Sequence, residues 1–376
     1  MKICGIAAEY NPFHTGHQYQ IEEVRRRTDC DLILAVMSGD FVQRGEPAVA
    51  DKITRAVCAV KNGVDAVISL PYIYSTQSAS WFAHGAMSLL KLAGADCVSF
   101  GSECGNLENL LEIAETPVNP DHLHESMDTG MSFPKAYSLL TTDMRPNDIL
   151  AVSYLKELEG SGIQPVLIQR SSSYNDPQLH EVSSALAIRT AMKENRDIRG
   201  LTPLDWLSSS DIPWMEQYWP YLRTFLLLSD SQVLSSYQMF SEGIENHLKE
   251  QAKEASSWKE FLRLSVNYRY TASRIRRTCL QAMLQITKEE VKRLGEPDTL
   301  QVLAFNEKGK EWLHSMRKSD VKIASRFARV PWHWRQMEFR SLMLYTSVMD
   351  EKKRREIIER EIGGAVYVKQ DSDPSA

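Results

Sequence analysis

The chain has 376 residues, 43% of them hydrophobic and 25% charged, with a formal net charge of −5. These values are ordinary for a globular protein, and the acidic balance excludes a uniformly basic surface, so any nucleic-acid binding must come from a local basic patch. No run of about 18 apolar residues is present, which excludes a membrane-spanning helix, and the first apolar run is too short for a signal peptide. We therefore expect a cytoplasmic protein whose six cysteines are free thiols.

Short apolar strands alternate with helices through the first half of the chain. The strands are expected at residues 3–8, 32–37, 66–70, 97–100 and 166–168. Continuous apolar strands separated by helices indicate an α/β fold with a five-stranded parallel sheet that is covered on both faces. Ligands of such sheets bind at the carboxyl ends of the strands, where the strand order reverses.

The first expected strand is followed by a turn at Asn11 and Pro12 and then by His14 and His17 at the start of a helix. Gly16 between the histidines allows a ligand to approach the backbone closely. Two imidazole donors beside the positive end of a helix dipole form a cradle for a phosphate group. A metal pair and ordinary surface histidines are the alternatives, and zinc is disfavoured because no further ligands lie at suitable spacing.

The residues around these histidines read Ala-Glu-Tyr-Asn-Pro-Phe-His-Thr-Gly-His from Ala8 to His17. This stretch resembles the signature of the HIGH-motif nucleotidylyltransferases and, in its longer form, that of the bacterial tRNA(Met) cytidine acetate ligase family. The resemblance implies a Rossmann-like sheet and ATP as a substrate, and we expect Mg²⁺ as a bridging ion. It implies that this stretch forms much of the ATP site, through Ala7, Ala8, Glu9, Tyr10, Asn11, Pro12, Phe13, His14, Thr15, Gly16, His17 and Gln20.

The loop after the second expected strand carries Asp40 and Arg44, and the next helix carries Lys52 and Arg55 three residues apart. Phosphate or carboxylate binding is one interpretation of these charges. A solvated surface loop is an equally good one on the residues alone. The family resemblance favours function and implies that Asp40 and Lys52 are catalytic together with His14 and His17.

Three further loops follow expected strands or begin helices. Gly101 comes directly after a strand and lets a ligand approach, although a plain turn explains it as well. Asn147 and Asp148 open a helix, for which capping alone is a sufficient explanation. Arg170 ends the last strand. The resemblance implies that Gly101, Asn147 and Arg170 contact ATP, and the choice between Asn147 and Asp148 stays open.

The helix expected over residues 183–194 begins with Ser183 and Ser184 and contains Arg189. On its own this pattern is typical of a capped amphipathic helix. It also resembles the Ile-Ser-Ser-x-x-x-Arg element of nucleotidylyltransferases, which implies that the two serines and the arginine hold the β- and γ-phosphates of ATP.

From about residue 196 the strand pattern nearly vanishes, apart from a weak alternation over residues 300–305. We expect an ATP-binding domain over residues 1–195, a mainly helical region over 196–370 and a disordered tail over 371–376. Residues 259–280 contain six Lys or Arg and one acid. Arginine and tyrosine together suit phosphate contacts and base stacking, so the candidate tRNA-binding residues, which the resemblance also implies, are Arg269, Tyr270, Arg274, Arg276 and Arg277.

These patterns together predict adenylyl transfer, in which a carboxylate attacks the α-phosphorus of ATP and pyrophosphate leaves. The resemblance implies that the carboxylate is acetate and that the acetyl group passes to N4 of the wobble cytidine of elongator tRNA(Met). A small-molecule nucleotidylyltransferase is the nearest alternative. A non-catalytic RNA-binding protein on a nucleotide-binding fold is the other.

Overall fold

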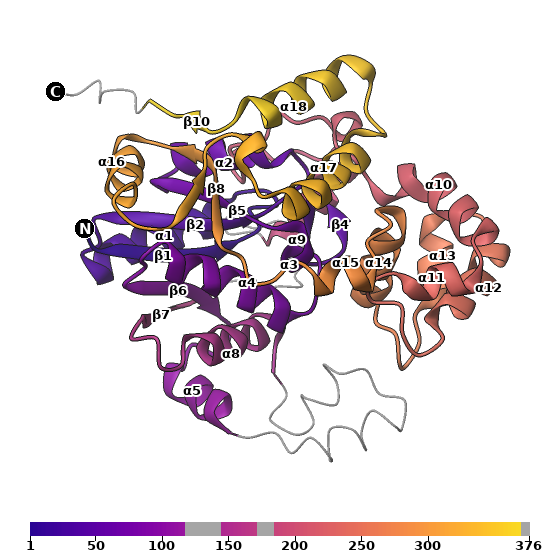
Figure 1. Cartoon of the computed structure of the whole chain (residues 1–376), viewed down its shortest axis with the longest axis horizontal. Helices are drawn as coiled ribbons and strands as arrows, with labels where there is room; N and C mark the ends of the chain where they lie inside the picture. The colour runs from indigo at the N-terminus through magenta and orange to yellow at the C-terminus, as the bar shows by residue number, and fades with distance from the viewer. Residues whose placement is uncertain (117–143, 171–183, 370–376) are drawn as a thin grey trace.

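The computed structural model describes residues 1–116, 144–170 and 184–369. A central sheet with helices on both faces dominates it, and a group of helices stands to one side (Figure 1). In the described part the sheet has eight strands. Their bounds are β1 (Ile3–Ala8), β2 (Leu32–Ser38), β5 (Ala66–Leu70), β6 (Cys97–Ser102), β7 (Gln164–Gln169), β8 (Thr299–Phe305), β9 (Lys322–Ala324) and β10 (Val366–Tyr367).

The five strands expected from the sequence are all present, and they pair in parallel in the order β5-β2-β1-β6-β7. The chain builds outward from β1 through β2 to β5, and then crosses to the other side of β1 for β6 and β7. The strand order therefore reverses between β1 and β6, which is where a parallel sheet leaves a crevice for a ligand.

Both faces of the sheet are buried, as the continuous apolar strands predict. Alternate residues of β2 belong to two different cores, because successive side chains of a strand point to opposite faces. The helices that precede the C-terminal half are α1 (Thr15–Thr28), α2 (Lys52–Lys61), α3 (Tyr72–Ser75), α4 (Ala79–Leu92), α5 (Leu107–Glu115), α8 (Pro146–Leu158) and α9 (Ala185–Lys193). Helices α1 and α2 cover one face of the sheet, and α4 and α8 cover the other.

The expected strand number of five is too low, because the C-terminal half returns to the sheet and adds three strands. Strand β8 pairs antiparallel with β5, and both β9 and β10 pair with β8. The join is fixed by Asn306, whose backbone N–H donates to Asp65 O at 2.9 Å and whose Nδ2 donates to Asp65 Oδ1 at 3.0 Å. This addition covers the β5 edge, which would otherwise expose unpaired backbone groups.

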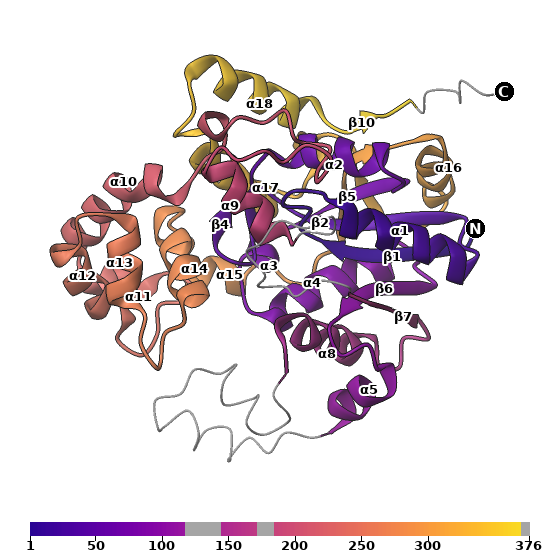
Figure 2. The ribbon, with the colours of Figure 1, turned by 180° about the vertical axis from the view of Figure 1, so that it is seen from behind.

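A helical region formed by residues 215–283 stands beside the sheet in both ribbon views (Figures 1 and 2). Its core includes the rings of Trp219, Trp258 and Phe261, whose centroids lie 4.8–6.4 Å apart. Its helices are α10 (Met215–Leu228), α11 (Ser231–Ser236), α12 (Ile244–Glu254), α13 (Trp258–Ser265) and α14 (Ala272–Met283).

After the helical region the chain packs back on the sheet domain. The remaining helices are α15 (Lys288–Lys292), α16 (Glu307–Met316), α17 (Trp332–Thr346) and α18 (Glu351–Gly363). Among the described helices, none combines the length and the apolar character needed to cross a membrane. The tail expected to be disordered, residues 371–376, lies outside the described residues.

Candidate active site

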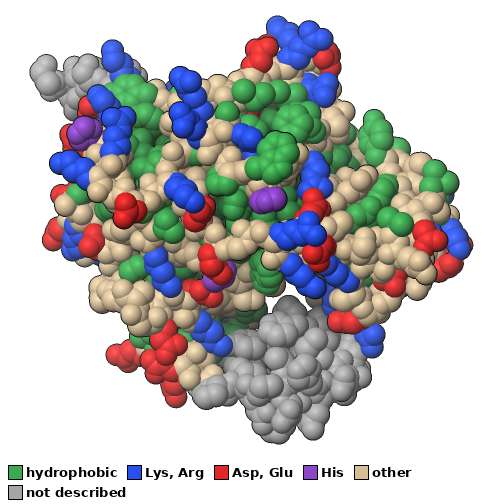
Figure 3. Space-filling model, in the orientation of Figure 1, with side chains coloured by type: hydrophobic (Ala, Val, Ile, Leu, Met, Phe, Trp, Pro, Cys, Tyr) green, Lys and Arg blue, Asp and Glu red, His purple; other side chains and the backbone are tan. Residues whose placement is uncertain are grey.

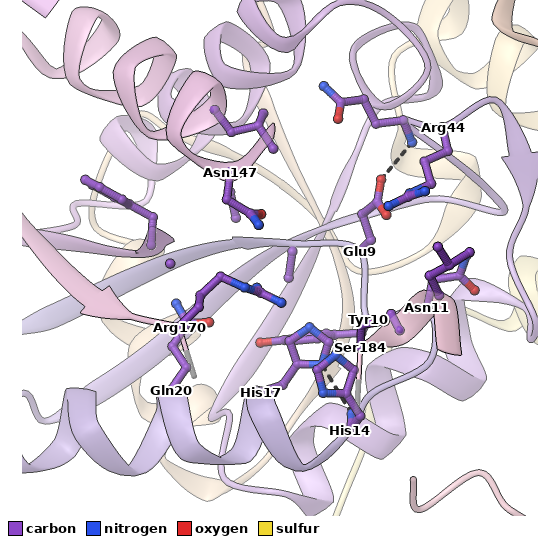
Figure 4. Close-up of a pocket in the computed structure, with 18 of the residues that line it drawn as sticks. Glu9, Tyr10, Asn11, His14, His17, Gln20, Arg44, Asn147, Arg170 and Ser184 are labelled. Atoms are coloured by element: carbon purple, nitrogen blue, oxygen red, sulfur yellow. Dashed lines mark hydrogen bonds between the residues drawn. The ribbon is translucent and has the colours of Figure 1, made fainter. Parts of the chain in front are cut away.

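A pocket lies at the carboxyl ends of β1 and β6, at the point where the strand order reverses (Figure 4). Its walls come from the loop after β1, the first turns of α1, α8 and α9, the turn after β3 (Phe41–Val42) and the ends of β6 and β7. Its described lining consists of Ala7, Ala8, Glu9, Tyr10, Asn11, His14, His17, Gln20, Gln43, Arg44, Phe82, Phe100, Gly101, Asn147, Leu150, Tyr154, Arg170, Ser184, Ala185, Leu186 and Arg189.

The two histidines cap α1 with their own side chains. His14 is the N-cap residue, and its Nδ1 accepts from the backbone N–H of Gly16 at 3.0 Å. His17 completes a capping box, because its Nδ1 accepts from the backbone N–H of His14 at 3.2 Å. Since both Nδ1 atoms act as acceptors, the proton of each neutral ring must sit on Nε2. Each ring thus keeps one N–H donor for another partner.

Burial keeps both rings neutral. Burial, with the positive charges of Arg170 and Arg189, lowers the pKa of His14 to about 3. Burial and His14 hold the pKa of His17 well below its usual value, with Arg170 adding to the effect. The two ring centroids lie 3.8 Å apart, so protonating both rings would place two charges in contact. The pair is therefore built to donate hydrogen bonds as neutral imidazoles.

The charge of the described pocket lining favours an anion. Arg44, Arg170 and Arg189 are its three basic side chains, and Glu9 is its one acidic side chain. Arg189 is buried, and its Nη1 donates to Asn11 O at 2.7 Å, which ties α9 to the turn after β1. The N-terminus of α9 faces the same space, and its N-cap Ser184 lines the pocket. Three guanidinium groups and two helix N-termini make a setting for phosphate.

A second wall of the pocket is apolar. Phe82 comes from α4, Phe100 from the end of β6, and Leu150 and Tyr154 from α8. None of these four residues was expected from the sequence, because an apolar residue beside a pocket looks the same as one in a core. Leu150 and Tyr154 lie three and seven residues after Asn147, so all three lie on one face of α8. This wall suits a flat ring such as adenine.

The choice between Asn147 and Asp148 follows from where each side chain goes. Asn147 lines the pocket, and its Nδ2 donates to Glu103 Oε1 at 2.7 Å. Asp148 is buried outside the lining, and its Oδ1 accepts from the hydroxyl of Ser102 and from the backbone N–H groups of Glu103 and Cys104. Asp148 therefore holds the turn after β6, and Asn147 is the one available to a ligand.

Gly101 and Arg170 lie against each other at the ends of β6 and β7. A Cβ at position 101 would come within 3.2 Å of Arg170 Cγ. The missing side chain therefore lets the arginine cross the strand end and reach the pocket, where Figure 4 shows it extending toward the two histidines. Gln20 also lines the pocket and donates to Ser99 Oγ at 3.2 Å.

The sequence and the fold match known proteins along nearly the whole chain. Residues 1–360 match the model of the HIGH Nucleotidyl Transferase family. The chain is 38% identical to the tRNA(Met) cytidine acetate ligase of Limosilactobacillus reuteri over 330 residues, which covers 85% of this chain and 88% of the relative. The corresponding protein of Caldanaerobacter subterraneus is also 38% identical, with 88% and 90% covered. The chain belongs to the tRNA(Met) cytidine acetate ligase family.

Solved structures of the family superpose closely on this chain. The apo crystal structure of Thermotoga maritima TmcAL matches with a TM-score of 0.89 at 30% identity, covering 98% of this chain and all of that one. A second crystal form of the same protein, bound with alpha-thio ATP, matches with a TM-score of 0.87 at the same identity and coverage.

Four residues of the family's His-x-Gly-His stretch that were expected at the ATP site are not in the described lining, namely Pro12, Phe13, Thr15 and Gly16. Phe13 is fully buried in the core beside Tyr10 and His17, where it supports the pocket from behind. Gly16 contributes a backbone N–H to the His14 cap. Ser183 lies outside the described residues.

Asp40 and Lys52, expected as catalytic residues, lie outside the described pocket lining in a closed cluster. Lys52 is fully buried, and its Nζ lies 3.2 Å from Glu338 Oε2 and 2.6 Å from Glu361 Oε1. Asp40 is also buried, and its Oδ1 accepts from the backbone N–H of Lys52 at 3.0 Å. The two glutamates come from α17 and α18, so this cluster joins the C-terminal helices to the sheet.

The electrostatics of this Lys52 cluster are those of a buried charge network. The carboxylates raise the pKa of Lys52 against the effect of burial, so the amine stays charged. Burial raises the pKa of Asp40 and raises that of Glu361 to about 7. Arg55 lies beneath the strand ends and donates to the carbonyls of Glu9, Ser38, Gly39 and Ala50.

The basic segment of the helical region splits between the surface and the interior. Arg269 is exposed, and Arg274 is partly exposed and lies over the Tyr270 ring at 5.0 Å from its centroid. Tyr270 itself is buried, and its hydroxyl donates to Glu242 O at 2.9 Å, which rules out base stacking on its ring in this arrangement. Arg276 pairs with Glu46 at 3.3 Å, and Arg277 donates to the backbone carbonyls of Gln43 and Gln77.

Within residues 1–116, 144–170 and 184–369, no group of three or more His, Cys, Asp or Glu side chains is placed to hold an ion. The six cysteines are free, as expected.

Proposed function

We propose that this chain is an ATP-dependent ligase that activates acetate as acetyl-adenylate. It then transfers the acetyl group to N4 of the wobble cytidine of elongator tRNA(Met), with AMP and pyrophosphate as the other products. The observation that carries the proposal is the pair of neutral histidines whose free Nε2–H donors share a pocket with three arginines. The names of its relatives support the choice of substrates.

The first step joins acetate to ATP. A carboxylate oxygen of acetate attacks the α-phosphorus, and the bond from that phosphorus to the β-phosphate oxygen breaks. Negative charge builds on the phosphoryl oxygens, so donors that are already in place lower the barrier without moving a proton. His14 and His17 supply Nε2–H donors for these oxygens. Ser184, Arg189 and the N-terminus of α9 suit the departing pyrophosphate.

The second step transfers the acetyl group to RNA. The N4 amine of cytidine attacks the acetyl carbonyl carbon, the bond to AMP breaks, and the amine releases one proton. The same donors that stabilise charge on the α-phosphate also make AMP a better leaving group. The two steps thus use one pocket, which must admit a single base after pyrophosphate has left.

The adenine ring of ATP and the expected Mg²⁺ ion suit different residues of the pocket. The apolar wall of Phe82, Phe100, Leu150 and Tyr154 suits the ring, and Asn147 supplies an amide at its edge. Mg²⁺, when bound, would shield phosphate charge, and it commonly binds with few protein ligands because it keeps most of its waters. Glu9, the acid of the described lining, is the residue suited to hold it.

The RNA-binding part of the proposal rests on the basic surface beside the helical region. Arg269 is exposed there, just before α14, and Arg274 in its first turn is partly exposed and pairs with Glu242 at 3.4 Å. Figure 3 shows Lys and Arg side chains gathered where the helical region meets the sheet domain. A phosphate backbone that follows this junction gains affinity from the charges without needing a basic protein overall.

The test is an incubation with ATP, acetate and total tRNA. The proposal expects AMP and pyrophosphate only when acetate is present, and acetylated cytidine in tRNA by mass spectrometry of nucleosides. ATP consumption that is indifferent to acetate and tRNA would instead identify a small-molecule nucleotidylyltransferase. RNA retention without any ATP turnover would identify a non-catalytic RNA-binding protein.

A further inference from the structure

One wall of the nucleotide pocket is a tight turn between β3 and β4 (Glu46–Pro47), and two of its residues, Gln43 and Arg44, line the pocket. The turn closes through the backbone N–H of Gly45, which donates to Val42 O at 2.8 Å. Its strands have only two residues each. So short a hairpin is marginally stable alone, and its position depends on what holds it.

The pocket side of the turn is held by Glu9. Glu9 Oε1 accepts from the backbone N–H of Gln43 at 2.8 Å, which links the end of β1 to the turn. Figure 4 shows this bond and places the Arg44 side chain beside the Glu9 carboxylate. The pocket side therefore holds the backbone N–H of Gln43.

The far side of the turn is held by α14. Arg277 Nη1 donates to Gln43 O at 3.2 Å and to Gln77 O at 2.9 Å. Arg276 pairs with Glu46 at 3.3 Å. Gln43 thus donates its N–H to Glu9 on the pocket side and accepts at its C=O from Arg277 of α14.

Gly45 brings the turn into direct contact with the helix backbone. Its φ is +76°, and a Cβ there would come within 2.6 Å of the backbone N of Arg277 and 2.7 Å of Arg276 Cβ. Both the left-handed backbone and the lack of space require glycine. Burial, with the charge of Arg274, lowers the pKa of Arg277 to about 10, so the half-buried side chain is still charged at neutral pH.

We propose that Arg277 is a positioning residue for the ATP site: through Gln43 it holds the turn that presents Arg44 to the nucleotide. It is therefore not one of the RNA-binding arginines, although it lies on the same helix as Arg274. This inference rests on the proposed ATP-dependent function of the pocket. It also makes α14 an element that both the RNA surface and the nucleotide pocket share.

The test compares Arg277→Met with Arg293→Met, which removes an exposed arginine that pairs only with Glu289 in the described part of the chain. We expect Arg277→Met to raise the KM for ATP and the Kd for an ATP analogue about 10-fold, the size expected for lost hydrogen bonds from a charged group. The kcat at saturating ATP and the tRNA affinity should stay within about twofold of the unmodified protein. Arg293→Met should leave all four values unchanged.

Three further variants separate positioning from folding. Arg277→Lys keeps the positive charge but lacks the planar, forked donors of the guanidinium, so its ATP affinity should lie between those of Arg277→Met and the unmodified protein. Gly45→Ala should weaken ATP binding by pushing the turn away from the α14 backbone while the Arg277 side chain is still present. Glu9→Ala, which removes the acceptor of the Gln43 N–H, combined with Arg277→Met should cost less than the sum of the two single changes, because both act through Gln43.

The possible outcomes distinguish a failure of this inference from a failure of the proposed function. Unchanged ATP affinity in Arg277→Met with weaker tRNA binding would overturn the proposal and make Arg277 an RNA ligand. A lower melting temperature with unchanged ATP affinity, measured well below that temperature, would reduce its role to folding and also overturn it. If the unmodified protein binds no ATP, the proposed function fails. If it binds ATP and Arg277→Met binds equally well, only this inference fails.

Discussion

Two polar clusters lie at the carboxyl ends of neighbouring strands, and both were expected to be catalytic. In the pocket cluster at β1 and β6, the two histidines use Nδ1 for their own backbone and keep Nε2–H for a partner. In the Lys52 cluster, the amine is enclosed by Glu338 and Glu361 and has no exposed surface. The two clusters lie at neighbouring strand ends but differ in composition. The pocket cluster is rich in histidine and arginine, whereas the Lys52 cluster is one lysine among carboxylates and lies outside the described pocket lining.

The comparison shows that a binding site is identified by hydrogen-bond donors, such as the two Nε2–H groups, that the fold itself does not use. Pocket donors gain a partner when an anion arrives, so they contribute binding energy. The Lys52 amine already has its carboxylate partners. Removing it would leave those carboxylates buried without a counter-charge, which is destabilising. The first cluster is thus suited to bind, and the second to fasten α17 and α18 to the sheet.

The largest expected effect is on stability, from Lys52→Met. This change leaves Glu338 and Glu361 buried without their cation and should lower the free energy of unfolding by about 3–5 kcal/mol, measured by urea denaturation. Lys253→Met, which removes an exposed lysine paired with Glu250, should change it by less than about 0.5 kcal/mol.

If Lys52→Met keeps its stability and loses ATP turnover, the structural role given to the Lys52 cluster is wrong. Adding Glu361→Gln to Lys52→Met removes one of the stranded charges and should recover part of the lost stability. If the single variant does not fold, this double variant still tests whether the cluster acts through charge balance.

The next effect is on catalysis, from His14→Asn and His17→Gln. Asparagine keeps an acceptor at the N-cap and glutamine keeps the capping box, so helix α1 should retain its cap. Each variant loses an Nε2–H donor and should slow AMP formation about 10²–10³-fold, the usual loss for one transition-state donor. Retention of tRNA on a filter should not change.

For the histidine variants, a normal rate of AMP formation would mean that the rings serve only to cap α1. His17→Ala should abolish AMP formation, and loss of tRNA retention in that variant would point to a different role for the motif.

A smaller effect is expected from charge reversal on the RNA surface. Arg269→Glu together with Arg274→Glu should weaken tRNA binding about 10-fold and reduce the slope of log affinity against log salt by about 2. Arg277 is left out of this pair because its side chain donates to the backbone carbonyls of Gln43 and Gln77. An unchanged tRNA affinity at several salt concentrations would remove the RNA assignment from this surface.

The smallest effect is the pH dependence of stability that the neutral histidines impose. The folded pKa of His14 is lowered to about 3 from 6.5, so the unfolded chain takes up a proton before the folded one does. Stability is therefore fully present above about pH 6.5 and falls as pH drops toward 3, by at most ~1.4 kcal/mol per pH unit. Between pH 5 and 8, the melting temperature should depend less steeply on pH in His14→Asn than in the unmodified protein. Equal slopes in both proteins would mean that His14 is not held neutral.

Much of the pocket was predictable because its parts are local. The strand at residues 3–8, the Asn11-Pro12 turn and the two histidines follow one another in the chain, so their order alone places both rings at a helix N-terminus. Continuous apolar strands also determined a sheet covered on both faces, since no other arrangement buries them. Strand ends and helix starts indicated where Gly101, Asn147, Arg170 and Arg189 lie, but their expected place in the ATP site came from the family resemblance.

Only the tertiary structure decided which charged side chains are free and which are used internally. Lys52 and Asp40 have the sequence context of a ligand loop, but their partners come from α17 and α18 at the far end of the chain. Arg276 and Arg277 look like Arg274 in sequence, yet their side chains turn toward the β3–β4 turn. A local pattern reveals a charge and its helix face, whereas the partner that satisfies the charge depends on packing between distant segments. The apolar wall at Phe82 and the return of β8 to the sheet were hidden for the same reason.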